Sequence, residues 1–257
     1  MKKQFKVRLR FPTEVVQNIK HNLGNEFPVQ LRYSIKNYIK DWNQGGLPDE
    51  EFEEQGRDTD EGLQAAQLLE EAGYDAFTAD AGSYDAWYWA HPPIYQDYGC
   101  YLHLTEQLKD KVDVPLIIAG RMDDPKLATE VIAENEALDM VAIGRGLLAD
   151  PEWPTKVKHN QLKDIHPCIA CHDECLGRIF AGKPLSCAVN PACGREREYD
   201  IPQTNDPKNI AIIGGGLAGL EAARVCALKG REPPPRQATE ASLTSHILKK
   251  QCVTREI

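Results

Sequence analysis

VPLIIAG at residues 114–120 and LDMVAIG at residues 138–144 are short apolar runs, and each ends in a glycine that is followed by an arginine. Two similar runs come earlier in the chain, VQLRYSI at 29–35 and YDAFTAD at 74–80. Amphipathic stretches separate the four runs and predict helices between them. The alternation from about residue 11 to residue 150 therefore predicts repeated β/α units and a parallel sheet.

The expected helices carry recognisable ends. Asp58 and Glu61 stand three residues apart, as in a capping box, and Gly73 is placed to end that helix. Asp124 followed by Pro125 opens another helix in the same way. The helix boundaries thus agree with the positions of the predicted strands.

The connections that leave the first two strands are long, covering about residues 36–57 and 81–100, whereas those that enter each strand are short. In a β/α fold the loops after the strands lie on one face, where ligands bind. The second loop is rich in aromatic residues and contains Tyr84 and His91. Two interpretations of these aromatics stay open: ordinary loop packing, and a lid over a flat cofactor or substrate.

Composition excludes several classes of function. The 257 residues carry a formal net charge of -9, which argues against nucleic-acid binding because that relies on clustered Lys and Arg. No run of about 18 apolar residues is present and the basic N-terminus lacks a secretory apolar stretch, so we expect no membrane partner and a cytoplasmic location. Eight cysteines in that compartment favour thiolate chemistry over disulfides. The expected partner is a small molecule or a protein.

The segment HPCIACHDECLGRIFAGKPLSCAVNPAC at residues 166–193 contains a Cys-x2-Cys-x3-Cys pattern and a fourth cysteine after eleven more residues. Three close thiolates and one returning thiolate can surround a 4Fe-4S cluster. Structural zinc is an alternative, although four-cysteine zinc sites usually pair two hairpins, and unmetallated thiols are another. The expected cluster ligands are Cys168, Cys171, Cys175 and Cys187.

Other residues near this pattern have less specific roles. His166 and His172 flank the ligands and are expected to be outer hydrogen-bond donors or surface residues. Cys193 could replace a ligand, but NPAC is typical of a turn that ends the site. The cysteines without partner spacing are predicted to be buried or incidental thiols. They are Cys100, Cys226 and Cys252.

IAIIGGGLAGLEAARVCALKG at residues 210–230 predicts an apolar strand, a glycine turn and a helix. The turn contains the three glycines of a dinucleotide-binding motif, Gly214, Gly216 and Gly219. The acidic residue expected about 20 residues later falls in a proline-rich stretch. Glu232 and Glu240 lie near that place, but on no predicted strand. The sequence therefore contains the glycine turn of a nucleotide-binding site but lacks a predicted strand to present its acidic residue.

Two glycine and arginine pairs follow the third and fourth predicted strands. They are Gly120 with Arg121 and Gly144 with Arg145. In eight-stranded β/α barrels a phosphate commonly binds after the seventh and eighth strands, where backbone N–H groups converge and an arginine can grip it. Pairing of these arginines with Asp123 or Asp150 is the alternative. Arg32 lies inside an otherwise apolar strand, so its charge needs a partner, either a bound flavin or an inward carboxylate.

Together these residues resemble the NADH:flavin oxidoreductases related to Old Yellow Enzyme, in particular the longer members typified by 2,4-dienoyl-CoA reductase and trimethylamine dehydrogenase. The resemblance runs from Phe11 to about Gly230, and the cysteine spacing with SCAVNP is its most specific part. The aromatic stretch DAWYWAHPP resembles the bile-acid-inducible enoate reductases.

The resemblance implies an FMN-binding barrel, a 4Fe-4S cluster just after it, and a C-terminal region that binds FAD and NAD(P)H. By position, Arg32 would contact the FMN ring region, and the two glycine and arginine pairs would hold the FMN phosphate. The four cysteines would ligate the cluster, and the three glycines of the turn would meet the FAD pyrophosphate. Tyr84 and His91 would lie on the substrate side, where His91 would either supply a proton or pack.

The resemblance also implies a fragment that begins at the helix before the fifth strand of a TIM (β/α)8 barrel. The expected divisions are a partial FMN-binding barrel at 1–160, an iron-sulfur segment at 161–200, a truncated Rossmann-like FAD-binding βα unit at 201–231 and an aberrant or disordered tail at 232–257. Half a barrel leaves two strand edges unpaired, so self-association through those edges is possible.

The parent reaction implied by the family is the NAD(P)H-dependent reduction of an activated C=C bond of the enoate or dienoyl-CoA type. Two alternatives stay open. One is an amine dehydrogenase of the same family, and the other is a non-catalytic metal-binding or inactive fragment. The sequence does not specify the substrate, the choice of NADH or NADPH, or the oligomeric state.

Overall fold

The computed structural model divides the chain into two compact units, Met1–Gly194 and Arg195–Ile257. The residues that it describes are 7–134, 138–206, 208 and 210–230. Among them, no helix is both long and apolar enough to span a bilayer.

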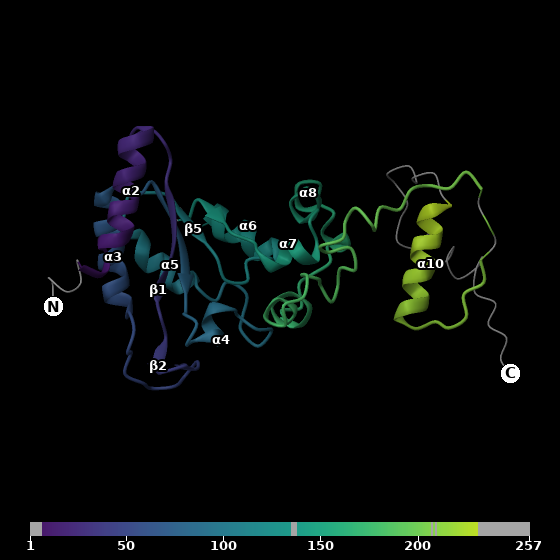
Figure 1. Ribbon diagram of the computed structural model, residues 1–257, viewed down its shortest axis with the longest axis horizontal. Helices are drawn as coiled ribbons and strands as arrows, with labels where there is room; N and C mark the ends of the chain where they lie inside the picture. Colours follow the sequence, from purple (N-terminus) through teal and green to yellow (C-terminus); the bar gives the residue numbers. More distant parts are fainter. Residues whose placement is uncertain (1–6, 135–137, 207, 209, 231–257) are drawn as a thin grey trace. The chain divides into compact units, whose positions relative to one another are not determined.

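A parallel sheet of four strands forms the centre of the first unit (Figure 1). The strands are β1 Gln30–Lys36, β4 Ala76–Ala81, β5 Leu116–Ile118 and β6 Met140–Val141. Their spatial order is β1-β4-β5-β6, with Leu31 opposite Phe77 and Phe77 opposite Leu116. Each strand coincides with one of the four predicted apolar runs, β1 and β4 extending one residue beyond theirs, and order in space follows order in sequence, as in a β/α barrel. The predicted α/β fold with a parallel sheet is confirmed.

Helices alternate with the strands (Figure 1). They are α2 Arg10–Leu23, α3 Thr59–Ala72, α5 Leu102–Lys109 and α6 Pro125–Glu134. Helices α3, α5 and α6 pack on strands of the sheet, and α2 packs on α3. The Asp58 carboxylate caps α3 by accepting the N–H of Glu61 at 2.8 Å, and Gly73 ends that helix with a left-handed φ of 116°. Asp124 accepts the N–H of Leu127 at 2.7 Å at the start of α6. Both predicted helix starts are confirmed.

The hydrophobic core lies between the sheet and these helices. Ile35, Phe77 and Ile118 of the strands are completely buried, and so is Leu108 of α5. Burying one such side chain stabilises a fold by about 1.5–3 kcal/mol, so the apolar runs that predict the strands also contribute to the core of this unit.

The loop after β1 contains a hairpin that the apolar pattern does not predict. It is formed by β2 Ile39–Asp41 and β3 Gln44–Gly45, and both strands are too short to give a periodic signal. The Trp89 indole donates a 2.7 Å hydrogen bond to the carbonyl of Gly46, and its ring stacks on Tyr38 with 3.9 Å between centroids. The hairpin therefore fixes the aromatic loop that follows β4, which includes the short helix α4 Trp87–Ala90.

The cysteine-bearing segment consists of short helical turns. After α7 Arg145–Ala149 and α8 Trp153–Lys158 come the 3-10 helix η1 Leu162–Asp164, the π-helix η2 Asp173–Gly177 and α9 Arg178–Phe180. The buried carboxylate of Asp150 accepts hydrogen bonds from Lys156 at 2.6 Å and from the backbone N–H of His166 at 2.8 Å. At the other end, the Asn190 amide donates to the carbonyl of Leu148 at 2.9 Å. These contacts tie the segment to the helices that follow β6.

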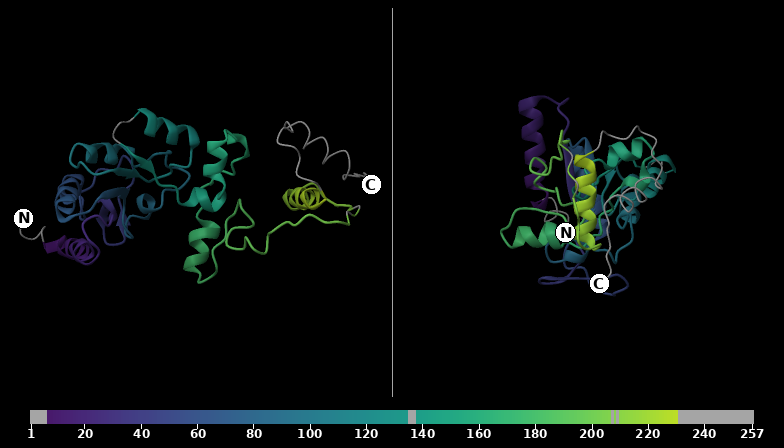
Figure 2. Two further views of the ribbon diagram at one scale, coloured as in Figure 1. Left: turned by 90° about the horizontal axis from the view of Figure 1, so that it is seen from above. Right: turned by 90° about the vertical axis from the view of Figure 1, so that its right-hand side faces the viewer.

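In the second unit, helix α10 Leu217–Lys229 follows an irregular stretch (Figure 2). The helix is confirmed, but the strand expected at 210–213 is not formed, and Ile213 is fully exposed. A strand needs a neighbour to pair with its N–H and C=O groups, and the described residues of this unit contain no second strand. Glu232, Glu240 and Cys252 lie outside the described residues.

Candidate functional site

A cavity of about 440 Å³ lies at the carboxyl ends of the four parallel strands. The residues predicted to contact FMN all line it: Arg32 from within β1, and Gly120, Arg121, Gly144 and Arg145 from the segments after β5 and β6. His91, predicted for the substrate side, lines the same cavity. The topology of the sheet therefore brings the residues predicted separately for FMN and for the substrate to one cavity. Its volume suits a small-molecule site.

Arg32 finds its partner on the neighbouring strand. Its Nε and Nη2 atoms lie 2.8 Å and 2.7 Å from the same carboxylate oxygen of Asp80. Of the two partners considered for this charge, the inward carboxylate is thus present in the chain itself. The pair presents a cation and an anion side by side at the ends of β1 and β4.

Arg121 holds the aromatic loop over the cavity. Its Nη1 atom donates to the carbonyls of Ile94 at 3.0 Å, Pro93 at 3.3 Å and Gln96. Its guanidinium also lies over the ring of Tyr98, 4.3 Å from the centroid. All these bonds use Nη1, so within the described part of the chain Nη2 and Nε remain as donors for an anion.

Gly120 is required by its surroundings. Its φ of 92° is left-handed, and a Cβ atom there would lie 2.5 Å from the ring of Tyr101. Only glycine therefore lets the backbone turn beside that buried ring.

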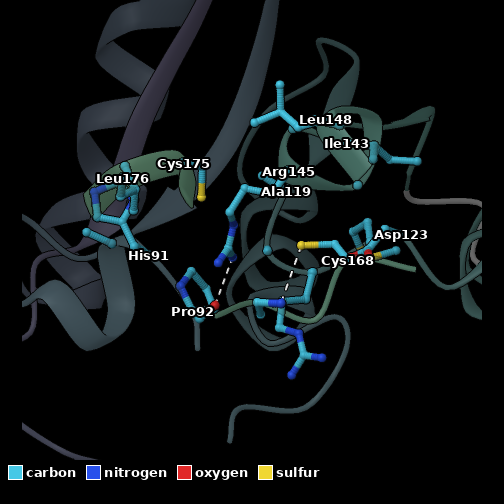
Figure 3. Close-up of a pocket in the computed structure, with 18 of the residues that line it drawn as sticks. His91, Pro92, Ala119, Asp123, Ile143, Arg145, Leu148, Cys168, Cys175 and Leu176 are labelled. Carbon is cyan, nitrogen blue, oxygen red and sulfur yellow. Dashed lines mark hydrogen bonds between the residues drawn. The ribbon is translucent and has the colours of Figure 1, made fainter. Parts of the chain in front are cut away.

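Arg145 joins the aromatic loop to the cysteine-bearing segment (Figure 3). Its Nη2 atom donates to the carbonyl of Pro92 at 2.8 Å, and its Nη1 atom contacts Nε2 of His172. Among the described residues, neither Arg121 nor Arg145 forms an ion pair with Asp123 or Asp150, the alternative partners suggested by the sequence. Asp150 is bonded to Lys156 instead, and both arginines donate to backbone carbonyls or contact His172. Burial raises the pKa of Asp123, and the positive charges of both arginines still act on this carboxyl and lower its pKa against that larger effect.

His91 is half-buried beside these cations. Burial lowers the pKa of His91, and the positive charges of Arg145 and Arg32 lower it further, so its imidazole is neutral at pH 7. Its ring lies 4.7 Å from that of Trp87. Tyr84 does not line the cavity; it is largely exposed and meets Trp87 edge to face at 5.5 Å.

The four predicted cluster ligands line a second, water-sized cavity of about 20 Å³: Cys168, Cys171, Cys175 and Cys187. The Cys168 thiol accepts the N–H of Ala170 at 3.4 Å, and burial raises the pKa of that thiol. No disulfide joins the described cysteines. The described residues also contain no group of three or more His, Cys, Asp or Glu side chains arranged to hold a metal ion. The donor type and the convergence suit an iron-sulfur cluster, but the sulfur atoms are not in ligating positions.

The two cavities adjoin. They share five lining residues, namely Arg145, Leu148, Cys168, Ala170 and Cys175. Figure 3 shows the side chains of Cys168, Cys175 and Arg145 together in the larger cavity. A group bound in the larger cavity and one held by the cysteines would therefore be neighbours.

In the second unit, the three glycines of the predicted turn lie at the start of α10. Gly216 is the residue before the helix. A Cβ atom on Gly219 would lie 2.0 Å from the carbonyl oxygen of Gly214, so the turn cannot accept a larger residue there. Gly219 therefore lies against the start of the turn itself.

Several cavity residues were not anticipated from the sequence. Leu176 and Ile179 line it from η2 and α9, and Phe180 packs edge to face on Trp87 at 5.3 Å. Their segment has little periodicity, so no sequence pattern marks which side chains turn inward. For Trp87, the sequence offered one indication, the high aromatic content of the loop after β4.

The parallel sheet and the cavity at one edge of it are those of a β/α-barrel type of fold. The chain belongs to the NADH:flavin oxidoreductase / NADH oxidase family, whose model matches residues 4–164. It is 55% identical over 225 residues to a cinnamate reductase of Clostridium sporogenes, covering 88% of this chain and 34% of that protein. It is 38% identical over 230 residues to an NADH oxidase of Thermoanaerobacter brockii, covering 89% and 33%.

Among solved structures, a 2-naphthoyl-CoA reductase in complex with 2-naphthoyl-CoA is similar, with a TM-score of 0.75 and 28% identity. That match covers 87% of this chain and 32% of the other. The chain thus spans about a third of the length of the proteins that it matches.

Proposed function

We propose that this chain supplies the phosphate side of an FMN site and an adjoining 4Fe-4S site in an NAD(P)H-dependent reductase of activated C=C bonds. The observation that carries the proposal is the shared wall of the two cavities, lined in common by Cys168, Cys175 and Arg145 among others. Bound FMN would supply hydride chemistry, and a cluster would supply single-electron transfer to it.

The residues at the strand ends would hold FMN. Arg121 would bind the phosphate through Nε and Nη2, together with backbone N–H groups after Gly120 and Gly144. Arg145, whose Nη atoms contact Pro92 and His172, would contribute its positive charge. The chemistry of the larger cavity supports this assignment, because its strand side carries the cations that a phosphate requires. Arg32, held by Asp80, would face the ring region of the flavin.

The cysteine-bearing segment, residues 161–200, would hold the cluster through Cys168, Cys171, Cys175 and Cys187. The backbone N–H donated to the Cys168 sulfur supports this, because such hydrogen bonds tune iron-sulfur sites. Residues 201–231 would begin an FAD-binding unit, in which Gly214, Gly216 and Gly219 meet a pyrophosphate. A cytoplasmic location and association of copies through the edge strands β1 and β6 belong to the same proposal.

His91 would act on the substrate. A neutral imidazole in the cavity can donate a hydrogen bond from its N–H group to the carbonyl or carboxylate that activates a C=C bond. Its protonated form, the imidazolium, would supply a proton to the reduced product and return to the neutral form. Tyr84 would approach the same substrate from the aromatic loop. Identity of 55% to a cinnamate reductase favours a C=C reductase over the amine dehydrogenase alternative.

The test separates the two cofactor sites within one preparation. The full chain is purified without oxygen, reconstituted with FMN, iron and sulfide, and assayed for bound flavin and bound iron. Cys171→Ser should lose the iron and the visible absorbance of the cluster while keeping FMN. Arg121→Ala should weaken FMN binding by about 10- to 100-fold, because a bond to a charged group contributes about 1.5–3 kcal/mol.

The controls make each arm specific. Cys226→Ser removes a thiol from the second unit and should change neither the amount of bound FMN nor the amount of bound iron. Riboflavin lacks the phosphate, so its affinity should stay the same in Arg121→Ala. Full iron content in Cys171→Ser would contradict the ligand assignment, and an equal loss of riboflavin and FMN in Arg121→Ala would contradict the phosphate assignment.

A further inference from the structure

Four rings form a continuous cluster beside the larger cavity. Tyr84, Trp87 and His91 come from the loop after β4, and Phe180 comes from α9. Trp87 is the centre, because it meets Tyr84 at 5.5 Å, Phe180 at 5.3 Å and His91 at 4.7 Å between centroids. The cluster thus joins two segments that lie almost a hundred residues apart in the sequence.

The cluster leaves a large apolar surface open. Phe180 is 66% exposed and Trp87 is 37% exposed, whereas Tyr101 beside the same loop is almost fully buried. Exposed aromatic side chains that gather at a cavity indicate a binding surface, because single surface aromatics are ordinary and contiguous ones are not. His91 links this surface to the cavity, since its ring lines the cavity and packs on Trp87.

The cavity itself has two chemically different sides. Arg32, Arg121 and Arg145, the residues assigned to FMN, lie on one side, whereas Leu176 and Ile179 form an apolar side next to Phe180. The apolar side is therefore the part of the cavity left for an apolar group of the substrate. The aromatic cluster extends the apolar side, and its open ring faces can receive another ring.

We propose that Trp87 and Phe180 form an aromatic wall that selects substrates whose reducible C=C bond is conjugated to an aryl ring. The inference rests on the proposed function and narrows its substrate class. A ring placed against Trp87 and Phe180 gains edge-to-face or offset contacts that an alkyl group lacks. The wall makes Trp87 and Phe180 specificity-determining residues, distinct from the hydrogen-bonding part assigned to His91.

The experiment compares two acids that differ only beyond the C=C bond. Binding of trans-cinnamate and of crotonate to the FMN-loaded full chain is measured by the change in flavin absorbance and by saturation-transfer NMR. Trp87→Ala and Phe180→Ala should each lower the preference for cinnamate by about two- to tenfold, with crotonate affinity unchanged. Phe180→Leu retains an apolar side chain of similar size but removes the ring, so this variant should lose most of the preference for cinnamate over crotonate. Trp42→Ala and Phe11→Ala, which remove exposed rings elsewhere, should leave the preference intact.

The outcomes separate the two proposals. Bound FMN is read first from its own absorbance, so failure to bind FMN contradicts the proposed function. If FMN binds and the preference for cinnamate is the same in the wild type, Trp87→Ala and Phe180→Ala, the aromatic wall is wrong and the proposed function stands. An equal loss of crotonate and cinnamate, or no binding of either acid to the FMN-loaded chain, also overturns the wall.

Discussion

Replacing Asp150 with Asn should loosen the junction between the helices after β6 and the cysteine-bearing segment. The Asp150 side chain is 3% exposed and accepts three hydrogen bonds. They come from Lys156 at 2.6 Å, from the N–H of His166 at 2.8 Å and from the N–H of Glu152 at 3.1 Å. Asn has the same shape but only one acceptor oxygen, so in either orientation its NH2 group faces at least one donor.

The expected loss in the free energy of unfolding is about 2–4 kcal/mol. A hydrogen bond to a charged group contributes about 1.5–3 kcal/mol, and an unsatisfied buried donor adds a penalty of its own. The loss stays below the upper end of the 3–5 kcal/mol range for broken buried ion pairs. The reason is that Lys156 is 20% exposed and keeps its 2.8 Å bond to the carbonyl of Asp164.

The same contact predicts a pH dependence. Burial opposes the charge of Asp150, but the hydrogen bonds from Lys156 and His166 outweigh it and hold the pKa of this carboxyl below its ordinary value. Because the folded pKa lies below the unfolded one, this stabilisation is fully present above the unfolded value and is lost as the pH falls through the folded value. The difference in the free energy of unfolding between the wild type and Asp150→Asn should therefore be constant from pH 7 to about pH 5 and shrink below about pH 4.

Urea unfolding at pH 7, 5, 4 and 3 measures this difference, and amide hydrogen exchange of His166 reports the junction itself. The His166 amide should lose protection in Asp150→Asn, because its acceptor is weakened. A difference below about 0.5 kcal/mol at pH 7 would refute the reasoning, since that is the scale of a neutral surface substitution. A difference as large at pH 3 as at pH 7 would refute the role of the charge.

Two further changes probe the frame around the larger cavity. Trp89→Phe removes the indole N–H donated to Gly46, so it should destabilise the first unit by about 1–2 kcal/mol in urea unfolding and speed limited proteolysis in the loop after β4. Gly120→Ala places a Cβ atom 2.5 Å from the Tyr101 ring at a left-handed φ, so it should cost about 1–3 kcal/mol and weaken FMN binding in a flavin titration. Gly144→Ala, whose Cβ would meet nothing within 4 Å and whose φ is negative, should change stability much less.

Local patterns in the sequence predicted the scaffold. The apolar runs around Phe77 and Leu116 give a strand wherever both faces are covered, and the caps at Asp58 and Gly73 act within one turn of their own helix. These patterns depend only on residues a few positions apart, so they can be recognised from the sequence alone. Parallel strands in sequence order also bring the residues after each strand to one edge, so the gathering of Arg121 and Arg145 followed from the topology.

The same reasoning failed where a local pattern needs a distant partner. The run at residues 210–213 has the composition of a strand, but no described neighbour pairs with it, and its residues stay irregular. The hairpin of β2 and β3 is the opposite case, since its short strands have no pattern and are held by Trp89 from another loop.

What each residue touches was decided by the tertiary structure alone. The sequence by itself determined a β/α sheet, the helix ends and the convergence of arginines on one edge, because these follow from periodicity and chain order. It did not determine that Arg145 bonds Pro92 and His172, or that Phe180 meets Trp87, since these contacts join segments 27 to 93 residues apart. Contacts at such separations depend on how the whole unit packs, and no short stretch of sequence records that packing.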